Sequence, residues 1–163
     1  MRVSAYIDGA NLFHAGEDIG VRIDYSKLKP IMISGRTPVD LNYYDSTENS
    51  LGEINFFKKI GGFGYTLKLV KLHRYGSSKP EEKKIDTQIV ADSLVDGLVN
   101  ARFDACIFGT GDKDIFPAIE YLLKAGKLVE VMSFEHSSSW DLRLCGAKII
   151  NLTKLKDQIC RNK

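Results

Sequence analysis

The chain alternates short apolar segments with longer ones in which apolar residues recur at helical spacing. Runs rich in β-branched and aromatic residues predict strands, at residues 3–7, 39–44, 65–72, 105–108, 128–134 and 148–152. The segments between them predict helices, at residues 11–19 (or an irregular turn), 25–33, 48–60, 85–100 and 115–125, with a short one ending at 144 and another starting at 153. Such alternation is typical of an α/β domain with a mostly parallel sheet.

Composition adds limits to this picture. The 163 residues suit one domain spanning residues 1–163, and 44% hydrophobic with 27% charged residues is an ordinary globular balance. The net charge of +2 is too small to indicate nucleic-acid binding by itself, although clustered carboxylates would leave the remaining surface more basic.

Cysteine usage and hydropathy bear on location. Cys106, Cys145 and Cys160 are widely spaced and show no paired ligand pattern, which favours reduced thiols. The sequence has no signal-peptide pattern, and no apolar run approaches the roughly 20 residues that span a bilayer. We therefore expect a cytoplasmic protein without a membrane partner.

Four aspartates occupy positions where a sheet brings strand ends together. Asp8 follows the first strand, Asp86 begins a helix, and Asp112 and Asp114 lie just beyond the strand at residues 105–108. Ligand sites in open parallel sheets form beyond the carboxyl ends of the strands. Clustered carboxylates repel one another unless a cation neutralises them, and hard oxygen ligands suit Mg²⁺ or Mn²⁺. The pattern predicts a metal site that acts on phosphate.

Two short polar side chains belong to the same turns. Asn11 follows Asp8 closely, and Thr110 lies between two glycines before Asp112. Both side chains can orient a water molecule or a phosphate oxygen through hydrogen bonds. We therefore place Asn11 and Thr110 in the predicted site as substrate-binding residues.

Several aspartates, two of these four included, have more than one interpretation. Asp114 is a metal ligand, a ligand through a water molecule, or the N-cap of the helix beginning near residue 115, and the ligand and cap roles can coexist. The helix dipole alone would explain Asp86 in a first turn. Asp92 lies about 240° around the helix from Asp86 and ranks below it as a ligand. Asp96 is expected on a solvated face. Trp140 is expected to pack in the core or at its rim rather than stack on a base.

The polar segment at residues 76–84 is the one that we expect to be mobile. It directly precedes Asp86, so it could contact substrate or close over the site. An ordinary solvated connection explains the same composition.

Three motifs in order resemble those of NYN-domain proteins of the LabA-like group, relatives of the PIN-domain nucleases. They are YIDGANL from residue 6, KIDTQIVAD from residue 84 and GTGDKDIFPAI from residue 109. The resemblance covers residues 3–152 and implies a Rossmann-like, PIN-like three-layer α/β sandwich. It also implies an acidic Mg²⁺ or Mn²⁺ pocket and RNA as the partner.

The resemblance assigns positions in this chain one by one. Asp8, Asp86, Asp112 and Asp114 match the acidic site, and Asn11 and Thr110 match its polar neighbours, although the family more often has serine at the position of Thr110. Asp92 also matches a recurrent aspartate, which makes it a weaker fifth metal-ligand candidate. These matches identify the candidate catalytic and metal-binding residues.

The leading hypothesis is a metal-dependent ribonuclease that hydrolyses phosphodiester bonds of RNA. The alternatives are a non-catalytic RNA-binding or regulatory module and, less favoured, a metal-dependent phosphatase or Toprim-like enzyme. Toprim sites draw a glutamate from the first strand motif, and haloacid dehalogenase phosphatases need a DxD there; this chain has Asp8 followed by Gly9 and Ala10. The oligomeric state stays open, a homodimer included.

Overall fold

A computed structural model describes residues 1–71 and 82–161 of the chain. Most of the polar segment at residues 76–84 lies outside these residues, so its mobility and its contact with substrate stay predictions. Residues 82–84 already belong to a helix. Among the described helices, none combines the length and apolar character needed to cross a bilayer.

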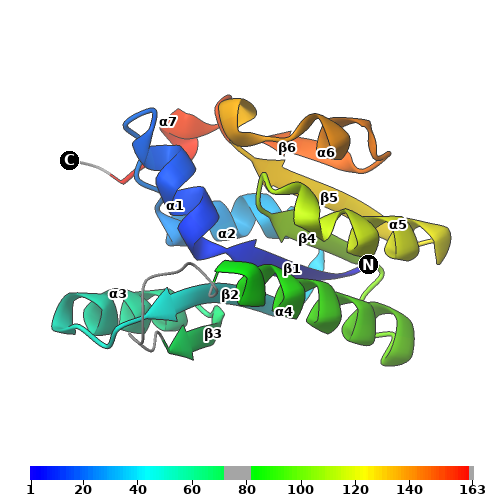
Figure 1. The fold of residues 1–163 in the computed structure, drawn as a ribbon, viewed down its shortest axis with the longest axis horizontal. Coiled ribbons are helices and arrows are strands. Elements are labelled where there is room, and N and C mark those ends of the chain that lie inside the picture. The colour runs from blue at the N-terminus through cyan, green and yellow to red at the C-terminus, as the bar shows by residue number, and fades with distance from the viewer. Residues whose placement is uncertain (72–81, 162–163) are drawn as a thin grey trace.

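Six strands form one sheet, and all five pairings between neighbouring strands are parallel (Figure 1). The strands are β1 (Arg2–Asp8), β2 (Thr37–Thr47), β3 (Thr66–Lys71), β4 (Ala105–Gly109), β5 (Leu128–Ser133) and β6 (Lys148–Asn151). Their order in space is β3-β2-β1-β4-β5-β6. This is the doubly wound order of Rossmann-like folds, so the predicted fold class is confirmed.

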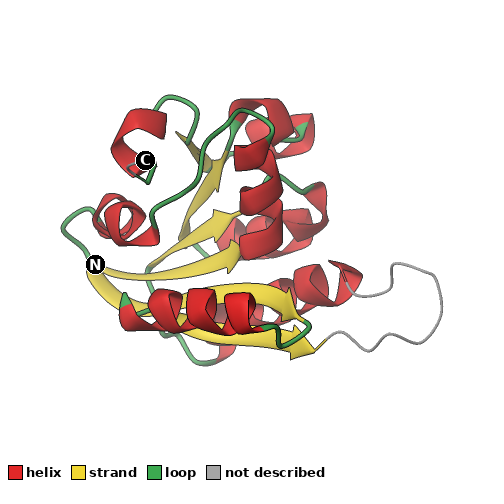
Figure 2. Cartoon of the chain, turned by 90° about the vertical axis from the view of Figure 1, so that its left-hand side faces the viewer, coloured by secondary structure: helices red, strands yellow, loops and turns green. Residues whose placement is uncertain are grey.

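Helices cover both faces of the sheet (Figure 2). One face carries α1 (Gly9–Glu17), α2 (Tyr25–Ile33), α3 (Leu51–Gly62) and α7 (Lys156–Ile159). The other carries α4 (Glu82–Leu94), α5 (Phe116–Lys124) and α6 (Trp140–Leu144). Alternate residues of β1 serve the two cores: Ala5 and Ile7 pack on the first face, and Tyr6 on the second. The result is the expected three-layer sandwich.

Helix α4 differs from its predicted form at both ends. It begins at Glu82, so Asp86 lies in its second turn and is neither a cap nor a first-turn residue. Its predicted last turn is a π-helix, Val95–Val99, in which Asn100 N donates to Val95 O at 2.9 Å. Helix-dipole stabilisation, which falls off beyond the first turn, therefore does not account for Asp86.

Two further segments deviate from the sequence prediction. Strand β2 extends beyond residues 39–44 to Thr37–Thr47, which carries its polar end past the end of β1 while it stays paired with β3. The terminal helix begins at Lys156 rather than Thr153, since residues 152–155 form turns. The three cysteines are free, as predicted, and Cys106 is buried.

Candidate functional site

The site lies where the direction of winding changes, between β1 and β4. These strands pair in parallel, with Ile7 opposite Gly109, so the chain leaves both at the same edge of the sheet. Asp8 is the last residue of β1, and Thr110 follows the last residue of β4. A crevice at this edge is where doubly wound folds bind ligands.

The turn after β1 fixes Asp8 at the start of a helix. Asp8 caps α1 by accepting a hydrogen bond from Asn11 N at 3.0 Å. Glycine fits at position 9, directly after Asp8, because a Cβ there would lie 2.2 Å from the Tyr43 hydroxyl. The carboxylate of Asp8 is thereby held beside the strand end.

The loop after β4 is clamped from two sides. Gly111 N donates to the side-chain oxygen of Asn11 at 3.0 Å, and Gly111 O accepts from Ser139 N at 3.0 Å. A Cβ on Gly111 would lie 2.3 Å from Ser137 O, so glycine is required for this close approach. Thr110 is fully buried, and its hydroxyl accepts from Asp112 N at 3.1 Å. Asn11 and Thr110 hold the loop in place, and their contact with substrate stays a prediction.

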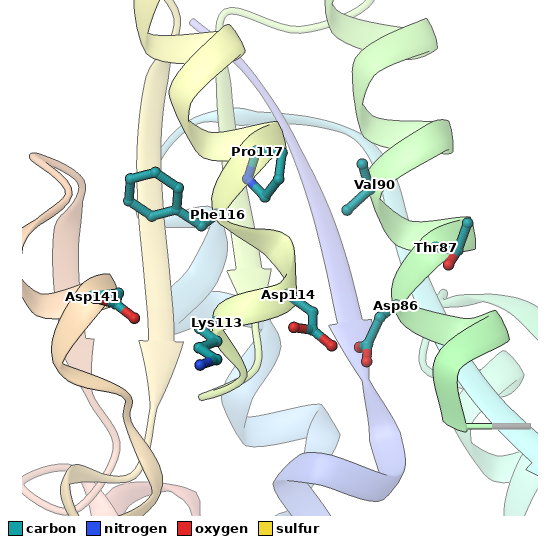
Figure 3. A pocket seen from close by; sticks show the side chains of 8 residues that line it. All are labelled: Asp86, Thr87, Val90, Lys113, Asp114, Phe116, Pro117 and Asp141. Atoms are coloured by element: carbon teal, nitrogen blue, oxygen red, sulfur yellow. The ribbon is translucent and has the colours of Figure 1, made fainter. Parts of the chain in front are cut away.

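Asp112, not Asp114, is the helix cap. The Asp112 side chain accepts from Asp114 N at 3.0 Å and starts a short 3-10 turn, Lys113–Ile115, that leads into α5. The predicted capping role of Asp114 is therefore wrong, because the chain needs one residue more to turn into the helix. The Asp114 side chain instead points toward Asp86 (Figure 3).

Three carboxylates meet at the end of the sheet. Carboxylate oxygens of Asp86, Asp112 and Asp114 all lie within 4.8 Å of one another. Burial of Asp86 and the negative charges of Asp8, Asp112 and Asp114 raise the pKa of the Asp86 carboxyl to about 7. Asp8, which is itself buried, is thus the fourth member of the charged group.

The cluster fits a hard divalent cation. Within the part of the chain that the structure describes, the buried Oδ1 of Asp86 has no hydrogen-bond partner. Unpartnered buried polar atoms are costly, and a metal ion satisfies such an oxygen and offsets the repulsion together. Oxygen donors alone suit Mg²⁺ or Mn²⁺ rather than softer metals.

Asp92 and Asp96 lie apart from this cluster. Asp92 accepts from the Tyr44 hydroxyl at 2.7 Å and from Gln88 Nε2 at 2.7 Å. Asp96 accepts from the Tyr6 hydroxyl at 2.8 Å, in a half-buried position. The expectation of a solvated Asp96 is wrong, because the π-helical turn carries it over the sheet. The strand alternation that turns Tyr6 toward α4 was the available signal.

A cavity of about 700 Å³ opens beside the carboxylates (Figure 3). Its lining residues come from α4, the turn after β4, α5 and α6, and are Asp86, Thr87, Val90, Lys113, Asp114, Phe116, Pro117 and Asp141. Sequence reasoning did not assign Lys113 or Asp141 to the site. Lys113 could have been found from its place between two candidate ligands, whereas nothing in the sequence places Asp141 there.

Trp140, next to Asp141, is a surface residue. Its side chain is 74% exposed, and the Arg143 guanidinium lies 5.0 Å from the ring centroid. The expected core or rim packing is therefore wrong. Its helix is only one short turn, Trp140–Leu144, and Leu142 alone supplies the buried contact.

The doubly wound, all-parallel sheet with an acidic cluster at its switch point is consistent with the PIN-like class of α/β folds. Within that class the chain belongs to the NYN domain family, whose model matches residues 2–153. The predicted NYN resemblance is thus confirmed, while the LabA-like subgroup stays a prediction.

Comparison with solved structures supports the fold. The chain is similar to a protein of unknown function from Vibrio parahaemolyticus, with a TM-score of 0.78 and 18% identity. The match covers 98% of this chain and 96% of that one. No curated protein matches the chain.

Proposed function

We propose that the protein is a metal-dependent ribonuclease that hydrolyses phosphodiester bonds in RNA. The proposal rests mainly on the convergence of carboxylates from three distant segments of an NYN-family chain, namely Asp8, Asp86 and the pair Asp112 and Asp114. Among the described residues, the buried Oδ1 of Asp86 has no hydrogen-bond partner. The capping roles of Asp8 and Asp112 do not explain why the carboxylates converge, because clustered carboxylates destabilise a fold unless a cation or a proton neutralises them.

Different residues would hold the cation and contact the substrate. Asp86, Asp112 and Asp114, supported by Asp8, would hold Mg²⁺ or Mn²⁺. A divalent cation bound there supplies positive charge to the scissile phosphate and lowers the pKa of a water molecule. Lys113 lies in the cavity lining beside Asp114 and offers an ammonium group for a phosphate oxygen.

The substitution Asp112→Asn tests the proposal. Asparagine is as good an N-cap as aspartate, so the turn into α5 should persist while a charged ligand is lost. We expect Mn²⁺-dependent cleavage of mixed single-stranded and structured RNAs to fall at least about 100-fold. Asp157→Asn, on an exposed position of α7, is the matched control and should cleave as the unsubstituted chain does.

Other results would assign the pocket differently. Unchanged cleavage by Asp112→Asn would trace the activity to a contaminant or to another site. RNA binding without turnover, across metals and substrates, would make the chain a regulatory binding module. Turnover of small phosphate esters but not of polynucleotides would point to phosphatase-type chemistry.

A further inference from the structure

A second cavity, of about 450 Å³, lies at the carboxyl end of β2. Its volume is within the usual range for small-ligand sites. The four clustered aspartates do not line it. The lining comes from α1, residues 21–25, β2, α3 and Arg161, and it includes Phe13, Arg22, Tyr25, Tyr43, Asp45 and Phe56.

Aromatic rings form much of this lining. Tyr25 and Tyr43 are buried and meet edge to face, with ring centroids 5.1 Å apart. Phe56 packs edge to face on Tyr43 at 6.3 Å. Phe13 also lines the cavity and is 47% exposed, so its ring is accessible to a ligand. The accessible rings of Phe13 and Phe56 favour a planar ligand, since aromatic side chains stack on the face of any nucleobase.

Asp45 supplies a carboxylate to the same cavity. Its two oxygens accept from neutral donors, the Tyr43 hydroxyl at 3.2 Å and Ser46 N at 2.8 Å. An ionised carboxylate accepts about four hydrogen bonds, so these two leave capacity for a ligand. Burial raises the pKa of Asp45 to about 6. A ligand that donates N–H groups would relieve the cost of this burial.

Two arginines line the cavity together with the carboxylates of Asp45 and Glu53. The Arg161 guanidinium lies 5.6 Å from the Phe56 ring centroid, and its Nε donates to Ile23 O at 3.2 Å. Arg22 also lines the cavity and is exposed. Guanidinium groups bind phosphate oxygens well. The cavity therefore combines groups for a base with groups for its phosphate.

We propose that this second cavity binds a guanine nucleotide unit, with the base among the aromatic rings and its N1–H and N2–H groups donating to Asp45. Guanine is favoured because it presents two adjacent donors to one carboxylate, whereas uracil, cytosine and adenine present one donor group each. The unit is either a free nucleotide or a guanosine in an RNA strand. Binding of a guanosine within an RNA strand rests on the proposed ribonuclease function, whereas binding of a free nucleotide does not.

The position of the cavity suits a strand that also reaches the acidic cluster. Asp45 is close enough to Asp8 for the negative charge of Asp8 to contribute to the raised pKa of Asp45. The two sites are therefore neighbours along one edge of the sheet. A strand bound at both would place a guanosine at a fixed distance from the phosphate being cut.

Calorimetric titration of the full chain in EDTA tests base binding without turnover. The probes are the 5′-monophosphates of guanosine, adenosine, cytidine and uridine, together with an oligouridylate carrying one guanosine and the same oligouridylate without it. We expect guanosine to be preferred. Asp45→Asn should weaken binding at least about tenfold, because hydrogen bonds to a charged acceptor are lost.

Phe13→Ala provides a second variant whose exposed position leaves folding intact, and it should also weaken binding. Trp140→Ala removes another exposed aromatic outside the cavity and should bind as the unsubstituted chain does. Binding of guanosine monophosphate points to a free nucleotide, and binding of only the guanosine-containing oligouridylate points to RNA. Equal affinity for all bases, binding unaffected by Asp45→Asn and Phe13→Ala, or no binding of any probe overturns the proposal. None of these readouts depends on cleavage, so they are separable from a failure of the nuclease assay.

Discussion

Helix α4 and its π-helical extension carry aspartates in two opposite settings. Near its start, Asp86 faces other carboxylates and has a buried oxygen without a partner among the described residues. Further along, Asp92 and Asp96 each accept a tyrosine hydroxyl. One residue type thus occurs in two settings: a carboxylate supplied with neutral donors supports the fold, and one surrounded by like charge is the candidate for cation binding.

The hydrogen bonds made by Asp92 and Asp96 also determine where Asp86 lies. Tyr6 and Tyr44 lie on the neighbouring strands β1 and β2, and both turn toward the α4 face of the sheet. Their hydroxyls hold Asp96 and Asp92, so they fix where the helix crosses the strands. This placement carries Asp86 to the acidic cluster. The fold-supporting aspartates therefore position the one that we assign to metal binding.

The largest change in stability is expected when Asp86 is substituted. Folding raises the pKa of Asp86 from 3.8 to about 7, so this carboxyl binds its proton more tightly in the folded state. Its contribution to stability is full below about pH 4 and is lost as the pH rises to about 7. The full pKa shift corresponds to about 4 kcal/mol, and solvent screening of a carboxyl at the cavity edge reduces this to about 2 kcal/mol. Without metal, Asp86→Asn should therefore raise the free energy of unfolding by about 2 kcal/mol at pH 8 and change it little at pH 4.

Urea denaturation at the two pH values, in EDTA, measures this difference. Mn²⁺ should then stabilise the unsubstituted chain at pH 8 and stabilise Asp86→Asn much less, since a ligand that binds the folded state raises stability by mass action. A variant that is less stable than the unsubstituted chain at pH 8 in EDTA would show that Asp86 is well satisfied without a cation.

The aspartates differ in how far the sequence alone predicts their positions and roles. Asp8 and Asp112 were predictable because each directly follows an apolar strand, and parallel strands end at one edge. The cap role of Asp112 and the orientation of Asp114 were not, since one extra residue in a turn decides them. The position of Asp96 depends on a π-helical turn, which helical periodicity does not predict, and only the alternation of β1 that turns Tyr6 toward α4 points to it. Asp45 escaped notice because β2 extends beyond its apolar run.

A smaller effect is expected where the fold-supporting contacts are broken. Tyr6→Phe removes the hydroxyl that donates to Asp96 and leaves the half-buried carboxylate short of a donor. We expect the free energy of unfolding to fall by about 1–2 kcal/mol in denaturant titration. Tyr121→Phe, on a ring that is 55% exposed, is the matched control and should cost almost nothing. A loss of stability no larger than that of the control would show that the hydrogen bond from Tyr6 to Asp96 does not stabilise the fold.

The smallest effect is expected for Asp92→Asn, which decides whether Asp92 belongs with Asp86 or with Asp96. An asparagine oxygen can still accept from Tyr44, so only the contact with Gln88 is weakened and stability should fall by about 0.5 kcal/mol. RNA cleavage and Mn²⁺ affinity should match those of the unsubstituted chain, because Asp92 is outside the group formed by Asp86, Asp112 and Asp114. A drop in cleavage comparable to that of Asp112→Asn would instead make Asp92 a metal ligand, and the Tyr44 hydroxyl would then orient it.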